Sequence, residues 1–387
     1  MTHPGRHPTG STRTDRPRQF DDRPLLVFWE MTKACDLACR HCRACAQPDP
    51  GPDELTTAEG KALIDQLAEI GRPRPILILT GGDCLKRSDI VELASYAQSR
   101  QVPVAIAPSV TPQLRAETLE ALRACGVTTA SLSLDGSRSA THDQVRGIPG
   151  HFDETKAAIR LLHDHGFTVQ INTTVMKANL DELADIAVLL HEEAVAIWEV
   201  FFLISTGRGE DVPATSAEEN EEVCRFLVDA SRYGFTVRTV EAPFFRRIAA
   251  ERRSGRASEG KELSRRLHAQ LVAALGEPTA AVRAPSAATR DGKGIVFVAA
   301  DGDVYPSGFM PLRLGNIRTS PLIDIYRGHP LLRDIRAASF TGPCGSCEHA
   351  QLCGGSRARA FVSSGEALGS DPGCLWVAEA TAEPVLR

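Results

Sequence analysis

The segment Cys35-Asp-Leu-Ala-Cys39-Arg-His-Cys42 follows the apolar run Leu25-Leu-Val-Phe-Trp29 and spaces three cysteines by three and then two residues. Spacers this short let one loop bring three thiolates onto one face of a metal centre. Three thiolates are one ligand short of closing a tetrahedral zinc site or a [4Fe–4S] cube, so one iron of a cube stays open. Zinc motifs usually pair C-x2-C units instead. The segment therefore favours an iron–sulfur centre with an open position.

Composition limits the classes of protein that the chain can belong to. It has 387 residues, 42% of them hydrophobic and 24% charged, enough for one large domain with an appendage. Residues 1–24 lack the apolar middle of a signal peptide, and no apolar run reaches membrane-spanning length. We therefore expect a disordered arm over 1–24 and a cytoplasmic protein without a membrane partner, in which cysteines bind metal rather than form disulfides. A net charge of −5 disfavours nucleic acid as the partner.

Apolar strands alternate with amphipathic helices from residue 25 to 204. A capping box, Thr56 with Glu59, opens the first helix. Continuous apolar strands between helices predict a parallel sheet covered by helices, with right-handed crossovers. Six such units predict an α/β fold, a partial (β/α)6 TIM-like barrel over 25–240. A linker or helical segment over 241–290 and a small extension over 291–387 follow. The expected strands are 25–30, 75–79, 102–107, 127–134, 167–175 and 197–204.

Polar residues follow the expected strands at their carboxyl ends, where ligands bind in parallel α/β folds. Thr80-Gly81-Gly82-Asp83 ends the second strand, Ser109 follows the third, and Ser133-Leu-Asp135-Gly136 ends the fourth, with Arg146 ten residues beyond. The glycines allow close backbone approach to a ligand. Each motif also has a plain structural interpretation, as a strand-to-helix turn, a turn cap or a surface arginine.

A second set of cysteines, Cys344, Cys347, Cys353 and Cys374, supplies four ligands, enough to close one site. The spacing fits a structural zinc site or a fully ligated iron–sulfur cluster. Before it, a hairpin signal, Asp301-Gly302, lies between two short apolar runs. The stretch from Glu241 to Arg266 is dense in Arg and Lys, which usually indicates a solvated helix face, whereas such a face at the barrel mouth would attract carboxylates.

The first cysteine motif resembles the signature of the radical S-adenosylmethionine (radical SAM) superfamily. The resemblance implies that Cys35, Cys39 and Cys42 hold a catalytic [4Fe–4S] cluster whose fourth iron is chelated by SAM. It implies that Gly81, Gly82 and Asp83 correspond to the family's GGE motif at the SAM amino group, with Asp in place of Glu. Ser109 is implied near the SAM ribose, and Ser133 and Arg146 near its carboxylate. His41, in place of an aromatic residue, and Cys84, in place of proline, depart from the family pattern.

The second cysteine set resembles the C-terminal SPASM or twitch extension of the same superfamily. This implies one auxiliary [4Fe–4S] cluster on Cys344, Cys347, Cys353 and Cys374. The implied activity is reductive cleavage of SAM to a 5′-deoxyadenosyl radical that abstracts hydrogen from a substrate. We favour a small molecule, a tetrapyrrole side chain or a secondary metabolite, with flavodoxin or ferredoxin as reductant. Three alternatives stay open: a SPASM-type peptide maturase, an iron–sulfur carrier or scaffold without catalysis, and a zinc-stabilised binding protein.

Overall fold

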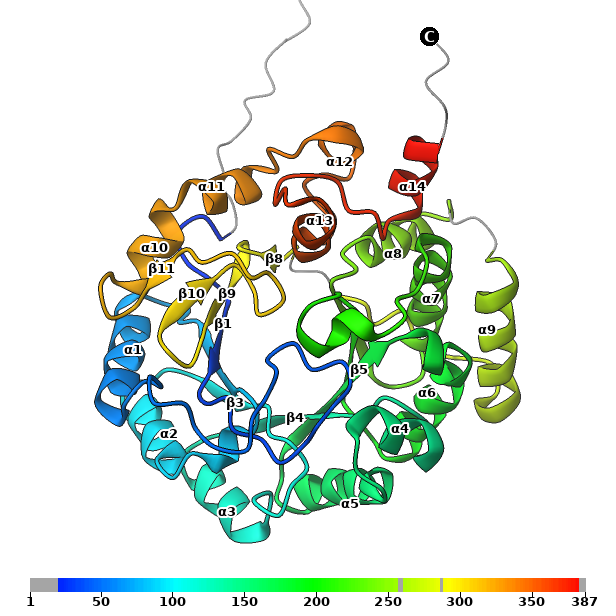
Figure 1. Cartoon of the computed structure of the whole chain (residues 1–387). Helices are drawn as coiled ribbons and strands as arrows, with labels where there is room; N and C mark the ends of the chain where they lie inside the picture. Colours follow the sequence, from blue (N-terminus) through cyan, green and yellow to red (C-terminus); the bar gives the residue numbers. More distant parts are fainter. Residues whose placement is uncertain (1–19, 257–259, 286–287, 383–387) are drawn as a thin grey trace, which may run out of the picture.

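The computed structural model describes residues 20–256, 260–285 and 288–382 of the chain. In these ranges the strands form one sheet in the order β11-β10-β9-β1-β2-β3-β4-β5-β6-β7, with β8 paired to β9. Figure 1 looks down this sheet, which curls into a ring with helices outside it. The strands are β1 (Leu26–Glu30), β2 (Ile76–Thr80), β3 (Val104–Ile106), β4 (Thr129–Ser133), β5 (Thr168–Val175), β6 (Ile197–Phe202), β7 (Thr236–Val240), β8 (Arg290–Asp291), β9 (Gly294–Val298), β10 (Asp303–Tyr305) and β11 (Gly315–Asn316).

The helices divide between the ring and the C-terminal extension. Those up to α9 surround the sheet, and α10 to α14 belong to the extension, drawn in orange and red in Figure 1. They are α1 (Thr57–Glu69), α2 (Ile90–Ser99), α3 (Ala116–Ala124), α4 (Ser139–Arg146), α5 (His151–Asp164), α6 (Leu183–Glu192), α7 (Ala217–Ala230), α8 (Phe245–Arg253), α9 (Glu262–Leu275), α10 (Leu322–Gly328), α11 (Pro330–Ala337), α12 (Gly342–Ser346), α13 (Arg357–Ser364) and α14 (Leu375–Ala382), with 3₁₀ helices η1 (Cys84–Lys86), η2 (Lys177–Glu182) and η3 (Gly207–Asp211).

The predicted partial α/β barrel is confirmed, and β7 and β9 extend its six predicted strands at either side. The strands from β1 to β7 pair in parallel with their neighbours. On the other side β1 pairs in parallel with β9, which then turns back into the antiparallel β10 at the predicted Asp301-Gly302 hairpin. The carboxyl ends of β1 to β7 and β9 therefore meet at one edge of the ring, where ligands bind in such folds.

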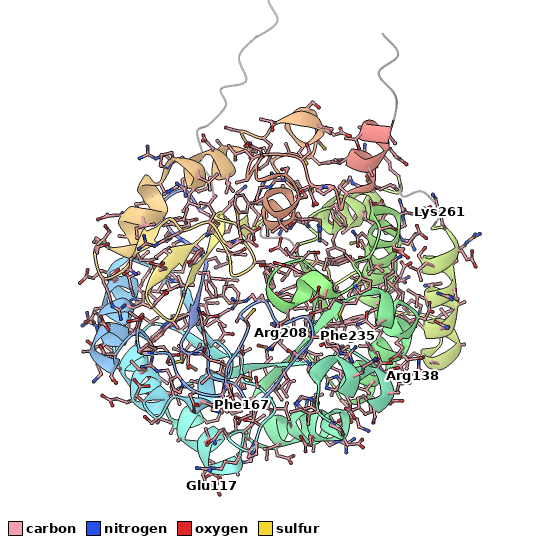
Figure 2. The ribbon with its side chains drawn as sticks, viewed as in Figure 1. Glu117, Arg138, Phe167, Arg208, Phe235 and Lys261 are labelled. Atoms are coloured by element: carbon pink, nitrogen blue, oxygen red, sulfur yellow. The ribbon has the colours of Figure 1, made fainter. Side chains whose placement is uncertain are left out.

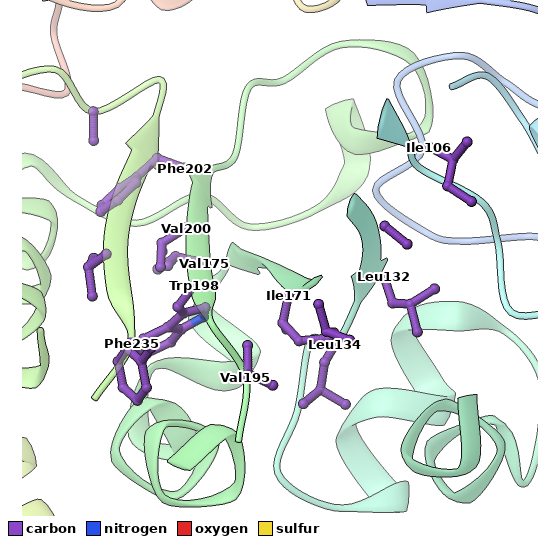
Figure 3. Packing of buried hydrophobic residues seen from close by; sticks show 14 of the residues in the cluster. Ile106, Leu132, Leu134, Ile171, Val175, Val195, Trp198, Val200, Phe202 and Phe235 are labelled. Carbon is purple, nitrogen blue, oxygen red and sulfur yellow. The ribbon is translucent and has the colours of Figure 1, made fainter. Parts of the chain in front are cut away.

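The core lies between the sheet and the surrounding helices. Alternate strand residues point outward, so Trp198, Val200 and Phe202 of β6 are buried while the residues between them face the interior of the ring. In Figure 3 Trp198 packs beside Phe235, whose ring meets that of Trp198 edge-on at 5.8 Å. Such a pair contributes about 0.5–1.5 kcal/mol beyond the area it buries. The side chains that face the interior of the ring are not part of this core and are available to bind a ligand.

Of the arm expected over 1–24, residues 1–19 lie outside the described residues. Phe20 is described, and its carbonyl accepts a 2.7 Å hydrogen bond from the hydroxyl of Tyr326 in α10. The first described residues thus contact the C-terminal extension. The predicted capping box is present, since Glu59 N–H donates to Thr56 Oγ1 and Thr56 N–H to Glu59 Oε2. None of the described helices is both long enough and apolar enough to cross a membrane.

Candidate active site and auxiliary metal centre

The loop that carries the first three cysteines continues the pairing of β1 with β2. Gly82 N–H donates to Thr32 O at 2.8 Å, and Asp83 N–H donates to Ala34 O at 2.7 Å. A Cβ on Gly81, whose φ is +147°, would lie 2.4 Å from Thr32 O, and one on Gly82 would lie 2.4 Å from Ala34 O. The two glycines are therefore required by the close passage of the cysteine loop.

Asp83 joins this loop to the segment after β3. Its carboxylate is fully buried and accepts hydrogen bonds from Leu85 N–H at 3.1 Å, Ser109 N–H at 3.3 Å and Thr111 Oγ1 at 2.7 Å. Burial raises the pKa of this carboxyl, and the three hydrogen bonds oppose the rise. Ser109 Oγ in turn donates to Gly82 O at 2.9 Å and lies 3.5 Å from Cys35 Sγ. The contact of Asp83 and Ser109 with SAM stays a prediction; in the structure both bind protein groups.

The three cysteines lie in one cluster, Cys35 and Cys39 with Leu37 and Cys42 packed against them. Cys35 and Cys39 are 8% exposed and Cys42 is half-buried. Burial raises the pKa of the Cys35 thiol, opposed by Ser109 and by Leu37 N–H, which donates to Cys35 Sγ at 3.3 Å. Arg146 Nη1 donates to Cys39 Sγ at 3.5 Å. Donors of this kind stabilise thiolates, and three adjacent thiols with such donors fit one face of an iron–sulfur cube.

Arg208 holds the same loop from the other side. Its Nε donates to Cys39 O at 2.9 Å and its backbone N–H donates to Cys42 O at 3.0 Å. In Figure 2 it is labelled near the middle of the ring. A Cβ on Gly207 would lie 2.7 Å from Cys42 O, which explains the glycine. The structure thus places Gly207-Arg208-Gly209, which follows β6, against the cysteine loop.

Arg146 and Asp135 form a buried ion pair beside the thiols. Arg146 Nη2 lies 2.6 Å from Asp135 Oδ2, and His41 Nε2 lies 3.6 Å from the same oxygen. Burial raises the pKa of the Asp135 carboxyl, but Arg146 and His41 outweigh it and the pKa falls below its usual value. Burial lowers the pKa of His41 to about 4, so this imidazole is neutral at pH 7. Ser133 faces the interior from β4, since its neighbours Leu132 and Leu134 are buried among the helices.

A chain of two buried histidines connects Asp135 with the segment after β3. Asp135 N–H donates to His142 Nδ1 at 3.1 Å, His142 Nε2 lies 2.9 Å from His151 Nδ1, and His151 Nε2 lies 3.1 Å from Val110 O. Because Asp135 N–H donates to His142 Nδ1, this nitrogen must be unprotonated. Neutral His142 and His151 with the hydrogen on Nε2 then satisfy all three hydrogen bonds. Burial lowers the pKa of His142 to about 3. The segments after β3 and β4 are thus fixed relative to each other.

The four later cysteines surround a single cavity. Within the described ranges no three Cys, His, Asp or Glu side chains converge tightly enough to hold one metal ion. Instead Cys344, Cys347, Cys353 and Cys374 all line a cavity of about 260 Å³ between α12, α14 and the loop before α13. His349 N–H donates to Cys347 Sγ and Gly355 N–H to Cys353 Sγ, each at 3.4 Å. Four thiols around one space, with backbone donors to sulfur, fit a fully ligated cluster.

Sequence reasoning missed Arg43 and the role of the arginines in the Glu241–Arg266 stretch. Arg43 directly follows Cys42, and its guanidinium lies in the interior of the ring. In the arginine-rich stretch, Arg246 and Arg247 turn inward toward the second cysteine set, while Arg252 and Lys261 pair with surface carboxylates. The signal for Arg43 was its position next to a cysteine ligand. The stretch itself carried no signal that separates its buried arginines from its solvated ones.

The fold and the site together define a class of protein: enzymes that cleave SAM at a three-cysteine cluster inside a partial barrel. A family model described as "Radical SAM superfamily" matches residues 29–190, and one described as "Iron-sulfur cluster-binding domain" (SPASM) matches residues 290–348. The chain belongs to the radical SAM superfamily, and SAM and two [4Fe–4S] clusters are its cofactors.

Relatives and solved structures match nearly the whole chain. It is 36% identical to an "AdoMet-dependent heme synthase" of Methanosarcina barkeri, covering 91% of this chain and 97% of the relative. It is 35% identical to a protein of the same name from Nitratidesulfovibrio vulgaris, covering 96% and 97%. Among solved structures, Streptococcus suis SuiB bound to S-adenosylmethionine has the same fold at 16% identity, with a TM-score of 0.67 and coverage of 92% and 78%. The prediction of a radical SAM enzyme with an auxiliary cluster domain is confirmed.

Proposed function

We propose that the chain is a SAM-dependent heme synthase that converts propionate side chains of an iron tetrapyrrole into vinyl groups. Support comes from the two relatives of that name, which are similar over more than nine-tenths of both chains. The predicted small-molecule substrate is thereby specified as a tetrapyrrole. Each propionate that reacts loses one hydrogen atom, one CO2 and one electron.

The balance of this reaction defines what the protein has to supply. A cluster held by Cys35, Cys39 and Cys42 would supply one electron for cleavage of bound SAM into methionine and a 5′-deoxyadenosyl radical. That radical would take one hydrogen atom from the propionate and become 5′-deoxyadenosine. The C–C bond to the carboxylate then breaks, CO2 leaves, the vinyl double bond forms, and one electron is left over. We assign the acceptance of this electron to the auxiliary cluster.

The observation that carries the proposal is a cluster of one guanidinium and three aromatic rings at the carboxyl end of the ring, in which Phe297 is buried and the other two rings are half-buried. The Arg43 guanidinium lies 4.5 Å from the ring centre of Phe297 and 5.8 Å from that of Phe309. Phe309 in turn lies 5.9 Å from the ring of Phe201. Phe201 and Phe297 are the penultimate residues of β6 and β9 and point away from the helices. We call Arg43, Phe201, Phe297 and Phe309 the aromatic shelf.

The aromatic shelf has the chemistry that a tetrapyrrole carboxylate requires. The half-buried rings of Phe201 and Phe309 suit contact with a flat macrocycle, and a guanidinium suits a propionate. Arg43 uses Nη1 for Glu30 at 3.3 Å, and its side chain keeps 20% of its surface exposed. Since Arg43 adjoins Cys42, a carboxylate on this guanidinium would lie beside the cluster at which the radical is formed.

The predicted site residues receive proposed roles on this basis. We assign Cys35, Cys39 and Cys42 to the SAM-binding cluster and Cys344, Cys347, Cys353 and Cys374 to the auxiliary one. Gly81, Gly82, Asp83, Ser109, Ser133 and Arg146 are assigned to the SAM pocket. A flavodoxin or ferredoxin is the proposed reductant, and we propose a cytoplasmic location. All of the assigned side chains, or the loops that carry them, lie at the carboxyl ends of the strands or in the extension.

The test measures both product and binding. The reconstituted protein with SAM and dithionite should convert iron coproporphyrin III to a product with vinyl groups, releasing one CO2 per 5′-deoxyadenosine. Arg43→Gln should weaken iron coproporphyrin binding by about ten- to a hundred-fold, the value of one charge-assisted contact, and Arg43→Lys by less. Arg74→Gln, just before the amino end of β2, is the matched control and should leave binding unchanged. Intact SAM cleavage without CO2 release from the tetrapyrrole would refute the proposed substrate.

A further inference from the structure

Three buried or half-buried arginines surround the second cysteine set without carboxylate partners. Arg290 donates to Ala350 O at 3.0 Å and to Gln351 O at 2.6 Å. Arg357 donates to Gly369 O at 2.6 Å and its Nη2 lies 4.0 Å from Cys344 Sγ. Arg246 donates to Leu352 O at 3.3 Å and to Thr289 O. Within the described residues, each of the three guanidiniums binds backbone carbonyls and has no carboxylate at ion-pair distance.

Two glycines after Cys353 make room for these guanidiniums. A Cβ on Gly354 would lie 1.7 Å from Arg290 Nη1, and a Cβ on Gly355 would lie 2.6 Å from Arg357 Nη2 and 3.3 Å from Cys344 Sγ. Phe340 lies beneath both guanidiniums, 5.3 Å from that of Arg290 and 4.4 Å from that of Arg357. Gly354 and Gly355 line the cysteine cavity, and the guanidiniums of Arg290 and Arg357 lie directly against these two glycines.

Neighbouring arginines, in contrast, form ion pairs with carboxylates. Arg247 also lines the cavity, but Glu221 lies 2.5 Å and Glu251 3.1 Å from its guanidinium. Arg359 lies 3.1 Å from Asp371. At the first cysteine set, Arg146 is likewise compensated by Asp135 at 2.6 Å. The buried carboxyl of Asp291 attracts all three guanidiniums electrostatically, but it makes no ion pair with them and accepts a 3.0 Å hydrogen bond from Ala358 N–H. Among the described residues, positive charge without a carboxylate in direct contact is therefore concentrated at the second site.

A buried charge is costly unless an opposite charge offsets it. A cube held by four thiolates is anionic and gains one more negative charge on reduction, and its reduction potential depends on net charge and on hydrogen bonds to sulfur. We propose that Arg246, Arg290 and Arg357 are positioning residues that favour the reduced auxiliary cluster and place its reduction potential above that of the SAM-binding cluster.

This inference gives the auxiliary cluster a direction of electron flow. A potential above that of the SAM-binding cluster disfavours its use as the donor for SAM cleavage and favours it as an acceptor. The one electron left after loss of CO2 can then be accepted by the oxidised cluster. Only this use of the potential rests on the proposed function. The potential itself is measured without substrate, so the two can fail separately.

The experiment measures the auxiliary cluster alone in the full-length chain. In a Cys35→Ala/Cys39→Ala/Cys42→Ala background, a redox titration followed by electron paramagnetic resonance gives the midpoint potential. Arg290→Gln and Arg246→Gln should each lower the ratio of reduced to oxidised cluster at a fixed potential at least tenfold, which is about 59 mV for a one-electron couple. Arg290→Lys keeps the charge and should shift the ratio less than threefold. The wild-type chain should show the auxiliary signal at a higher potential than the SAM-responsive one.

A matched control removes a compensated pair from the same cavity. Arg247→Gln/Glu221→Gln takes away one cation and one anion together and should change the ratio less than threefold. Gln variants with full iron content and an unchanged potential would overturn the proposal. So would loss of iron from both the Gln and the Lys variants, because the arginines would then serve folding of the extension rather than the charge of its cluster.

Discussion

Replacing Arg146 should be far more damaging alone than together with Asp135. The two side chains are 2.6 Å apart, and Asp135 has no exposed surface. With an effective dielectric constant of about 20, the attraction at that separation is about 6 kcal/mol, most of which offsets the cost of removing both charges from water. Arg146→Met leaves Asp135 buried and unpaired. We expect it to lower the free energy of unfolding by about 3–5 kcal/mol.

The double variant Arg146→Met/Asp135→Asn should recover most of this loss. The side-chain amide that replaces the carboxylate can still accept the 2.7 Å hydrogen bond that Thr174 N–H donates to Asp135 Oδ1. We expect the double variant to lie within about 1 kcal/mol of the wild type, because replacing both members of a buried pair is often nearly neutral. Guanidinium unfolding of the metal-free chain, with all four members of the cycle, gives the coupling free energy.

The same four proteins separate two roles of Arg146. If its guanidinium also contacts the SAM carboxylate, the double variant regains stability but still binds SAM about ten- to a hundred-fold more weakly after cluster reconstitution. If Arg146 only holds Asp135 and Cys39, affinity returns with stability. The reasoning about the buried pair is refuted if Arg146→Met costs less than about 1 kcal/mol, or if the double variant is no more stable than the single one.

Two further predictions concern the metal centres and the buried histidines. Reconstituted protein should hold about eight irons per chain. Replacing Cys35, Cys39 and Cys42 should remove about half of this iron and abolish 5′-deoxyadenosine formation, whereas replacing Cys344 and Cys347 should remove about half without abolishing it. Zinc in place of iron at the second set would contradict this prediction. The pKa values of His41 and His142, lowered to about 4 and about 3, make both histidines take up protons more readily when unfolded, so stability is full above pH 6.5 and is lost as the pH falls. At about pH 5 the loss should be about 2 kcal/mol for each histidine, measured as a lower guanidinium midpoint, and His142→Gln should flatten the pH dependence; equal slopes for both proteins would argue against it.

The sequence predicted the features that depend on local pattern. Alternating strands and helices predicted the partial barrel, Thr56 with Glu59 predicted a cap, and Cys35, Cys39 and Cys42 predicted the class of enzyme. These features follow from periodicity, capping and ligand spacing, which are visible over a few residues.

Features that depend on contacts between distant segments could not be predicted. β9 joins the barrel beside β1 across more than two hundred residues, and Arg146 pairs with Asp135, whose position at the end of the fourth strand did not predict this partner. The glycines at 81 and 82 had been assigned to ligand approach, whereas the structure shows the cysteine loop occupying the space a side chain would need. The roles of the individual SAM contacts stay predictions.

The spacing between Arg290 and Gly354 also constrains how this enzyme can change over evolution. Any side chain at 354 would occupy the position of the Arg290 guanidinium, so Arg290 can be inherited only together with Gly354. The reverse does not hold, because Gly354 has a φ of +71° that favours glycine whatever residue stands at 290. Substitution histories should therefore be asymmetric: lineages that lost Arg290 while keeping Gly354 are permitted, and lineages with the opposite combination should be absent.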